Sequence, residues 1–288
     1  MSNQGVFVSL NGNIMPKESA RIPADSSAVR YGTGCFETFR TDAGKFFKLG
    51  DHIDRLNRGI DYLSFGQIAP VIENDLKEQI LKLLEKNDLP DSSAKVRVQF
   101  LLDEKSGYNV DENPAHSVLI TVSELKPQRE MVSLATVKTI VIPTSSRPTE
   151  LKLSNMLHYR QAWREASQHG ANDALMLTQD GFVAETSIAN LFWIKENTVF
   201  TPDTACDILP GVMRNCVIGF ISDQLGLNVQ EGKYRLDELN KAETVWITNS
   251  VREIQFVRSI DGQEFDTDSE FCNKLLSDFE RLKEEKLR

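Results

Sequence analysis

A polar stretch near the middle of the chain interrupts a regular succession of strand and helix patterns. It reads Glu124-Leu125-Lys126-Pro127-Gln128-Arg129-Glu130, and polar segments that contain proline are typical of connections between domains. The 288 residues suffice for two ordinary domains, each with its own core. We therefore predict a small domain over residues 1–125, a linker over 126–130 and a large domain over 131–288.

Helix and strand patterns are mixed in the first predicted domain. Apolar residues recur with helical spacing over 52–63 and 72–85, which indicates two amphipathic helices. Alternating or apolar runs at 6–10, 96–100 and 117–122 are bounded by turn residues and predict strands. This combination favours an α+β fold for the small domain.

Strand patterns dominate the second predicted domain. We expect strands near residue 131 and over 173–178, 182–186, 190–194 and 244–248. Helices are expected over 154–169, from Pro210 to residue 226 and over 268–286. The large lobe should therefore be rich in β-structure and carry helices as well.

Composition excludes several classes of function. The formal net charge of −9 argues against a nucleic-acid binder, which needs a basic face to displace counterions. Four cysteines and four histidines stand in separate segments without the spacing of a metal site, so we expect no bound metal. The sequence shows no signal peptide or membrane span, and we expect a cytoplasmic protein that does not bind membranes.

One predicted helix begins with features suited to an anion. Its first residues are Pro210-Gly211-Val212-Met213-Arg214, where unpaired backbone N–H groups and the helix dipole favour a group such as phosphate. The alternative is an ordinary helix start, because proline is common in the first turn of any helix. Other residues are needed to decide between the two.

Several ordered sequence blocks supply such residues. The chain resembles the class IV aminotransferase family in the blocks Tyr31-Gly32-Thr33-Gly34-Cys35-Phe36-Glu37-Thr38-Phe39-Arg40, His52-Ile53-Asp54-Arg55-Leu56, Lys152-Leu153-Ser154-Asn155, Gly181-Phe182-Val183-Ala184-Glu185, Asn190-Leu191-Phe192 and Leu209-Pro210-Gly211-Val212-Met213-Arg214. The blocks occur in the family's order and cover most of the chain. The resemblance implies the two-lobed α+β architecture of fold type IV, a homodimer and pyridoxal 5′-phosphate as the cofactor.

Two residues carry the cofactor chemistry that this resemblance implies. Lys152 resembles the lysine that forms a Schiff base with the cofactor and then moves a proton between substrate and cofactor. Glu185 resembles the carboxylate that keeps the pyridine nitrogen protonated. An acid within apolar strand residues also argues for a buried partner on physical grounds.

A second group of residues would bind the cofactor phosphate. Arg55 resembles the family's phosphate-binding arginine, whose guanidinium can donate two parallel hydrogen bonds. The backbone at Val212 and Met213 would complete the site together with Thr248, Asn249 and Ser250. For the last three, a polar turn after a strand is an adequate structural alternative.

Substrate recognition is less clearly encoded. Tyr31, Phe36 and Arg97 fall where branched-chain members of the family place pocket residues, and Arg97 is suited to a carboxylate. The alternative for Arg97 is a strand arginine that pairs across the sheet.

Thr38 departs from the branched-chain pattern, in which glycine is usual. Aminodeoxychorismate lyases of the same family resemble the chain at this residue, where the threonine assists proton transfer. They also carry a basic, glycine-rich run where this chain has Leu102-Asp103-Glu104-Lys105-Ser106-Gly107-Tyr108. D-Amino-acid aminotransferases place an arginine at the position of Leu102, so neither specialised pattern is complete.

Three functions follow from these residues. The first is transfer of an amino group between an amino acid and a 2-oxo acid. The second is a lyase reaction that releases pyruvate and 4-aminobenzoate from 4-amino-4-deoxychorismate. The third is a binding protein without catalysis, against which the presence of both Lys152 and Glu185 argues.

Overall fold

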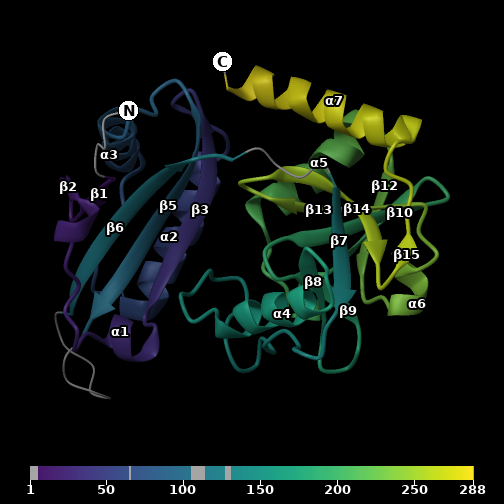
Figure 1. Ribbon diagram of the computed structural model, residues 1–288, viewed down its shortest axis with the longest axis horizontal. Coiled ribbons are helices and arrows are strands. Elements are labelled where there is room, and N and C mark those ends of the chain that lie inside the picture. The colour runs from purple at the N-terminus through teal and green to yellow at the C-terminus, as the bar shows by residue number, and fades with distance from the viewer. Residues whose placement is uncertain (1–5, 65, 105–113, 127–130, 288) are drawn as a thin grey trace. The chain divides into compact units, whose positions relative to one another are not determined.

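The computed structural model describes residues 6–64, 66–104, 114–126 and 131–287. The chain divides into two compact units (Figure 1). The first unit comprises Met1–Lys126 and Leu151–Asn155, and the second comprises Pro127–Glu150 and Met156–Arg288. The short segment Leu151–Asn155 thus belongs to the first unit although it follows part of the second in sequence.

The first unit contains a six-stranded antiparallel sheet in the order β2-β1-β6-β5-β3-β4. Its strands and helices are β1 (Phe7–Leu10), β2 (Asn13–Pro16), α1 (Ser27–Tyr31), β3 (Gly34–Asp42), β4 (Lys45–Phe46), α2 (Leu49–Ser64), α3 (Glu73–Lys86), β5 (Ser93–Asp103) and β6 (Ala115–Glu124).

One face of this sheet forms the core of the first unit. Burial alternates along β5, where Ala94, Val96 and Val98 are fully buried, because successive side chains point to opposite faces of a strand. The buried residues pack against the apolar stripes of α2 and α3, including Ile60 and Ile80. Both helices therefore cover the same face, and the opposite face is available for other contacts.

The second unit contains a nine-stranded mixed sheet. Its strands are β7 (Met131–Thr136), β8 (Asp173–Leu177), β9 (Val183–Thr186), β10 (Asn190–Lys195), β11 (Thr198–Pro202), β12 (Asn228–Gly232), β13 (Thr244–Asn249), β14 (Glu253–Ile260) and β15 (Gln263–Glu264). The main path runs β12-β11-β10-β13-β14-β7-β8-β9. Since β9 also pairs with β10, the path returns on itself and brings β9, β10 and β13 side by side.

Helices pack around this sheet in Figure 1. They are α4 (Leu157–Gln168), α5 (Val212–Gln224), α6 (Leu236–Leu239) and α7 (Glu270–Lys286). Helix α4 contacts β7 and β8, and α5 contacts β12 and β13. Phe279 of α7 packs edge-on against Phe220 of α5, with ring centroids 5.6 Å apart.

The structure differs from the sequence predictions in several elements. The helix expected over 154–169 begins only at Leu157, because the preceding backbone bonds to β3: Ser154 N–H donates to the Gly34 carbonyl at 2.8 Å. Strands β3, β11, β12 and β14 were not among the predicted elements. Their residues lie between the recognised patterns or, as in β12, are mostly polar or exposed.

The predicted domain boundary lies almost entirely in residues that the structure does not describe. Apart from Lys126, the expected linker over 126–130 lies outside the described residues. The boundaries at 125 and 131 therefore stay predictions. In the part of the chain that the structure describes, no helix combines the length and apolarity needed to cross a membrane, and no cluster of three or more His, Cys, Asp or Glu side chains is arranged to hold a metal ion.

Candidate active site

Lys152 lies in an extended segment alongside β3 of the first unit. Phe36 N–H donates to the Lys152 carbonyl at 2.9 Å, and Leu153 forms an antiparallel bridge with Cys35. Leu151 and Leu153 are buried in the core of the first unit. Because side chains alternate along an extended segment, Lys152 points to the face opposite this core.

That face also carries three of the predicted residues. The Lys152 ammonium lies 5.0 Å from the centroid of the Phe36 ring, and the Arg97 guanidinium carbon lies 3.7 Å from it. Thr38 is two residues beyond Phe36 on the same face and pairs with Arg97 of β5. The first unit thus brings Phe36, Thr38, Arg97 and Lys152 together.

Polar groups on this face are suited to bind a ligand. The Thr38 hydroxyl is buried and has no hydrogen-bond partner among the described residues. Arg97 Nε donates to Gln99 Oε1 at 3.3 Å, and burial lowers the pKa of Arg97. A half-buried guanidinium that stacks on a ring and bonds a neutral amide is a good receptor for a carboxylate.

Arg55 lies on the other face of β3. Its Nε donates to Glu37 Oε1 at 2.7 Å and its Nη2 to Glu37 Oε2 at 2.8 Å. His52 Nδ1 lies 2.7 Å from Glu37 Oε2. All three side chains are buried, so the structure does not place Arg55 with Phe36 and Thr38, and its phosphate role stays a prediction.

Tyr31 ends the short helix α1 and is exposed. Its helix stops at Gly32, which adopts φ +69°, a left-handed conformation that glycine adopts without steric cost. The structure shows the position of the Tyr31 side chain but leaves its predicted role in the substrate pocket untested.

Glu185 is buried near the end of β9 in the second unit, and its hydrogen-bond donors include a phenol, an amide and a backbone N–H. The Tyr159 hydroxyl donates to Oε1, Asn190 Nδ2 donates to Oε2 at 3.0 Å, and Leu209 N–H lies 3.2 Å from Oε1. Burial and then the neighbouring charge of Glu185 raise the pKa of Tyr159 well above its ordinary value. The hydroxyl therefore stays protonated and remains a donor to Glu185.

Sequence reasoning missed Tyr159 and Asn190 as parts of this site. Asn190 stood within a recognised block without an assigned role, and Tyr159 fell in a predicted helix. The signal that could have identified them is the buried carboxylate itself, because a charge in the protein interior requires hydrogen-bond donors.

Glu185, Asn190 and Thr248 form a row across three strands. Asn190 of β10 is paired with Glu185 on one side and with Thr248 of β13 on the other. Directly paired residues point to the same face about 5 Å apart, so the row spans roughly 10 Å. The buried Thr248 hydroxyl has no hydrogen-bond partner among the described residues and is available to an incoming group.

The start of α5 is attached to the same row. Asn190 Nδ2 donates to the Leu209 carbonyl at 2.8 Å, and a Cβ atom on Gly211 would approach Asn190 Oδ1 to 2.2 Å. Gly211 is the N-cap residue and provides no side-chain cap. The first backbone N–H groups of α5, at Val212 and Met213, thus lack intrahelical acceptors, which is the arrangement that suits an anion; their phosphate role stays a prediction.

The loop after β13 is compactly hydrogen-bonded. Asn249 Oδ1 accepts hydrogen bonds from the backbone N–H groups of Val251 at 3.0 Å and Arg252 at 2.8 Å. The Asn249 side chain therefore shapes the turn, which is the structural alternative raised for it. The predicted phosphate contacts of Asn249 and Ser250 stay untested.

The residues of the second unit fit a phosphorylated pyridine. Glu185 offers a buried carboxylate at one end of the row, which suits a protonated ring nitrogen. The unpartnered Thr248 hydroxyl at the other end of the row and the uncapped start of α5 beside Asn190 offer hydrogen-bond donors to an anion. The row has the length of a pyridine ring that carries a phosphomethyl group.

Comparison with known proteins agrees with this chemistry. Residues 34–260 match the family described as amino-transferase class IV. An aminodeoxychorismate lyase of Bacillus subtilis is 33% identical over 250 residues, which cover 86% of this chain and 84% of the lyase. The branched-chain-amino-acid aminotransferase-like protein 2 of Arabidopsis thaliana is 30% identical over 267 residues, which cover 91% of this chain but only 47% of that longer protein.

Solved structures support the same assignment. The branched-chain aminotransferase from the archaeon Thermoproteus uzoniensis, crystallised with norvaline, superposes with a TM-score of 0.88 at 25% identity, covering 98% of this chain and 95% of that one. This likeness confirms the predicted two-lobed α+β fold. A related aminotransferase structure contains pyridoxamine 5′-phosphate. The chain therefore belongs to the class IV aminotransferase family, whose members depend on pyridoxal phosphate.

Proposed function

We propose that this enzyme transfers the amino group of an amino acid with an apolar or carboxylate-bearing side chain to a 2-oxo acid. The observation that carries the proposal is the position of Lys152 beside Phe36, with Arg97 stacked on the same ring. The Phe36 ring can pack against an apolar substrate side chain, and the half-buried Arg97 guanidinium can bind a carboxylate. Both groups lie beside the Lys152 amine.

The bound cofactor supplies an aldehyde that links to amines and a ring that accepts electron density from the substrate. In our proposal Lys152 holds the cofactor covalently, is released by the incoming amine and then moves the proton of the substrate Cα. Glu185 keeps the ring nitrogen protonated, while Tyr159 and Asn190 hold its carboxylate in place.

The phosphate of the cofactor would bind in the second unit. We propose that the N–H groups of Val212 and Met213 and the Thr248 hydroxyl donate to it, with Asn249 and Ser250 completing the loop. Arg55 retains its predicted phosphate role as part of the proposal. Its ion pair with Glu37 fixes the orientation of the guanidinium.

The second candidate function is the lyase reaction, and Thr38 is the observation that favours it. Its buried hydroxyl has no partner among the described residues and lies on the Lys152 face, where it can assist a proton transfer. The lyase from Bacillus subtilis is also a relative over most of the chain. The segment 102–108 lacks the basic, glycine-rich run of the lyases, which argues against this function. Its residues 105–108 lie outside the described residues.

A spectral titration separates the two functions. The visible spectrum of the cofactor-loaded enzyme is recorded while L-branched-chain amino acids, L-glutamate, D-alanine and aminodeoxychorismate are added one at a time. Loss of the cofactor band with an amino acid, and its return with a 2-oxo acid, is the expected result. No change with any amino acid, together with pyruvate release from aminodeoxychorismate, would instead establish the lyase.

Substitution of the lysine tests the assignment directly. Lys152→Ala should abolish turnover and remove the site at which borohydride fixes the cofactor to the chain, as read by peptide mass spectrometry. Lys138→Ala, at an exposed position whose backbone N–H bonds Glu165, is the matched control and should behave as wild type. Full turnover by Lys152→Ala would refute the proposed mechanism.

Three further properties complete the proposal: a homodimer, a cytoplasmic location and domains over 1–125 and 131–288. The similarity to family members supports the dimer as an expectation. Light scattering checks it, and a mass of about one chain in solution would exclude it.

A further inference from the structure

The loop that joins β13 to β14 contains a residue in an unfavourable backbone conformation. Asn249 and Glu253 are paired across the two strands, so the loop has the three residues 250–252. Loops of this length commonly end in a left-handed residue, for which glycine is preferred. Here the left-handed conformation falls on Glu253, the first residue of β14 after the loop, with φ +58°, so this end of the turn benefits from additional stabilisation.

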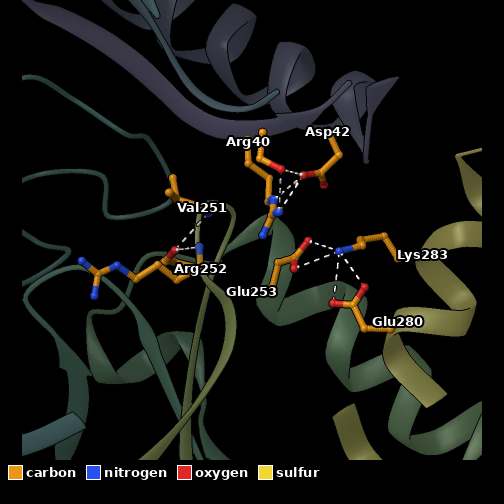
Figure 2. A network of polar contacts seen from close by, with 9 residues as sticks. Arg40, Asp42, Val251, Arg252, Glu253, Glu280 and Lys283 are labelled. Atoms are coloured by element: carbon orange, nitrogen blue, oxygen red, sulfur yellow. Dashed lines mark hydrogen bonds and ion pairs between the residues drawn. The ribbon is translucent and has the colours of Figure 1, made fainter. Parts of the chain in front are cut away.

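The terminal helix provides that stabilisation. Lys283 of α7 donates to both carboxylate oxygens of Glu253, at 3.0 and 3.1 Å (Figure 2). Both side chains are buried. Lys283 also contacts Glu280, at 2.9 Å, but that carboxylate is about half exposed. The pair with Glu253 is therefore the interaction most shielded from solvent.

Helix α7 also contacts the other elements around the predicted phosphate site. Phe279 packs against Phe220 of α5, and Phe271 packs against Trp246 of β13, each with ring centroids 5.6 Å apart. The helix thus touches the helix, the strand and the loop that carry the phosphate donors. A side chain of α7 that bonds the loop between β13 and β14 can therefore fix the position of that loop relative to α5 and β13.

We infer that Lys283 is a positioning residue for cofactor binding, which holds the 249–253 loop so that Thr248 and Ser250 meet the phosphate. The inference rests on the proposed phosphate site. Lys283 itself does not touch the cofactor. It acts by donating to both carboxylate oxygens of Glu253, which keeps the left-handed turn in the conformation that the phosphate requires.

The test compares pyridoxal 5′-phosphate with pyridoxal, which lacks the phosphate. Dissociation constants of both are measured by absorbance on the full-length apoenzyme. Lys283→Met should weaken binding of the phosphorylated form between about 10- and 100-fold, the scale expected from a small misplacement of binding groups. The affinity for pyridoxal should stay within about threefold of wild type, because the loop acts only on the phosphate.

Matched variants make the result specific. Glu280→Gln removes the exposed partner of the same ammonium and should leave both affinities unchanged. Glu253→Gly combined with Lys283→Met removes the buried carboxylate and suits the left-handed backbone, so it should recover part of the lost affinity. If Lys283→Met does not fold, Glu253→Gln provides the same comparison with a neutral side chain.

Two outcomes would overturn the inference: unchanged affinity for pyridoxal 5′-phosphate in Lys283→Met, or equal loss of affinity for both compounds. Thr248→Val separates this failure from failure of the proposed function. If Thr248→Val weakens phosphate-dependent binding and Lys283→Met does not, only the role of Lys283 is wrong. If neither variant changes the ratio of the affinities for pyridoxal 5′-phosphate and pyridoxal, the proposed phosphate site is wrong as well.

Discussion

Two buried carboxylates, Glu37 in the first unit and Glu185 in the second, are held by different kinds of donor. Both oxygens of Glu37 bond the guanidinium of Arg55, and His52 lies against one of them. The hydrogen bonds of Glu185 come instead from a phenol, an amide and a backbone N–H. Glu37 is held by a bidentate ion pair, whereas Glu185 is oriented by these neutral donors, and its charge also interacts with that of Arg147.

The difference separates a carboxylate that holds a charged side chain in position from one that is itself oriented by neutral donors. A bidentate ion pair compensates a buried charge within the protein, so Glu37 stabilises the arrangement of β3 and α2. Neutral donors orient Glu185, whose negative charge interacts with that of Arg147 and can also act on a bound cation. A protonated pyridine ring is such a cation.

The largest effect on stability is expected from Glu37→Gln. This change removes the carboxylate that pairs with the buried Arg55 guanidinium, and breaking a buried pair in this way costs about 3–5 kcal/mol. Urea unfolding measures the free energy of unfolding. Glu185→Gln, in which the neutral donors Tyr159 and Asn190 stay in place, is the control, and its free energy of unfolding should fall by less. Equal losses in the two variants would contradict the distinction between the two carboxylates.

The largest effect on catalysis is expected from Glu185→Gln. A neutral amide cannot keep the ring nitrogen protonated, and loss of one such preorganised group lowers kcat by roughly 100- to 1000-fold. Steady-state kinetics measures the change on fully cofactor-loaded enzyme. Glu185→Asp, which retains the charge, should recover part of the rate. A Glu185→Gln enzyme with wild-type kcat would show that Glu185 does not act on the cofactor.

The stabilising effect of Glu37 should depend on pH. Burial alone would raise the pKa of Glu37, but the Arg55 charge and the hydrogen bonds from Arg55 and His52 lower it from 4.5 to about 2. A lowered carboxyl pKa stabilises the fold above about pH 4.5, and this contribution is lost as the pH falls toward 2. The stability gap between wild type and Glu37→Gln should therefore narrow over that range in urea unfolding. A constant gap from pH 6 to pH 3 would contradict this origin.

The smallest effect is expected from Tyr159→Phe. The variant loses one hydrogen bond to a charged group, worth about 1.5–3 kcal/mol, while Asn190 and Leu209 still orient Glu185. We expect kcat/KM to fall about tenfold, with a change in the absorbance of the bound cofactor that a purely structural substitution would not cause. Tyr234→Phe, on a tyrosine whose hydroxyl donates to the exposed Gln230 carbonyl, is the matched control. Unchanged kinetics in Tyr159→Phe would exclude the hydroxyl from orienting Glu185.

Much of the fold was predictable from local patterns. Periodicity predicted helices α2, α3 and α7 and strands β5, β6 and β8 at their observed positions. An element that is buried on one face has apolar residues at regular spacing along its sequence. Strand β12 was missed because its residues are largely exposed. The early helix start predicted at Ser154 was wrong because pairing with β3 extends the backbone there.

The sequence by itself determined which chemical groups are present and their order: Lys152 within Leu-Lys-Leu, Glu185 in an apolar strand and a glycine at the start of α5. Only the tertiary structure decided which residues support them. Tyr159 bonds Glu185 across 26 residues, and Lys283 bonds Glu253 across 30. Local periodicity reports which face of an element is buried, but the partner on that face is selected by packing between distant segments, which no single segment encodes.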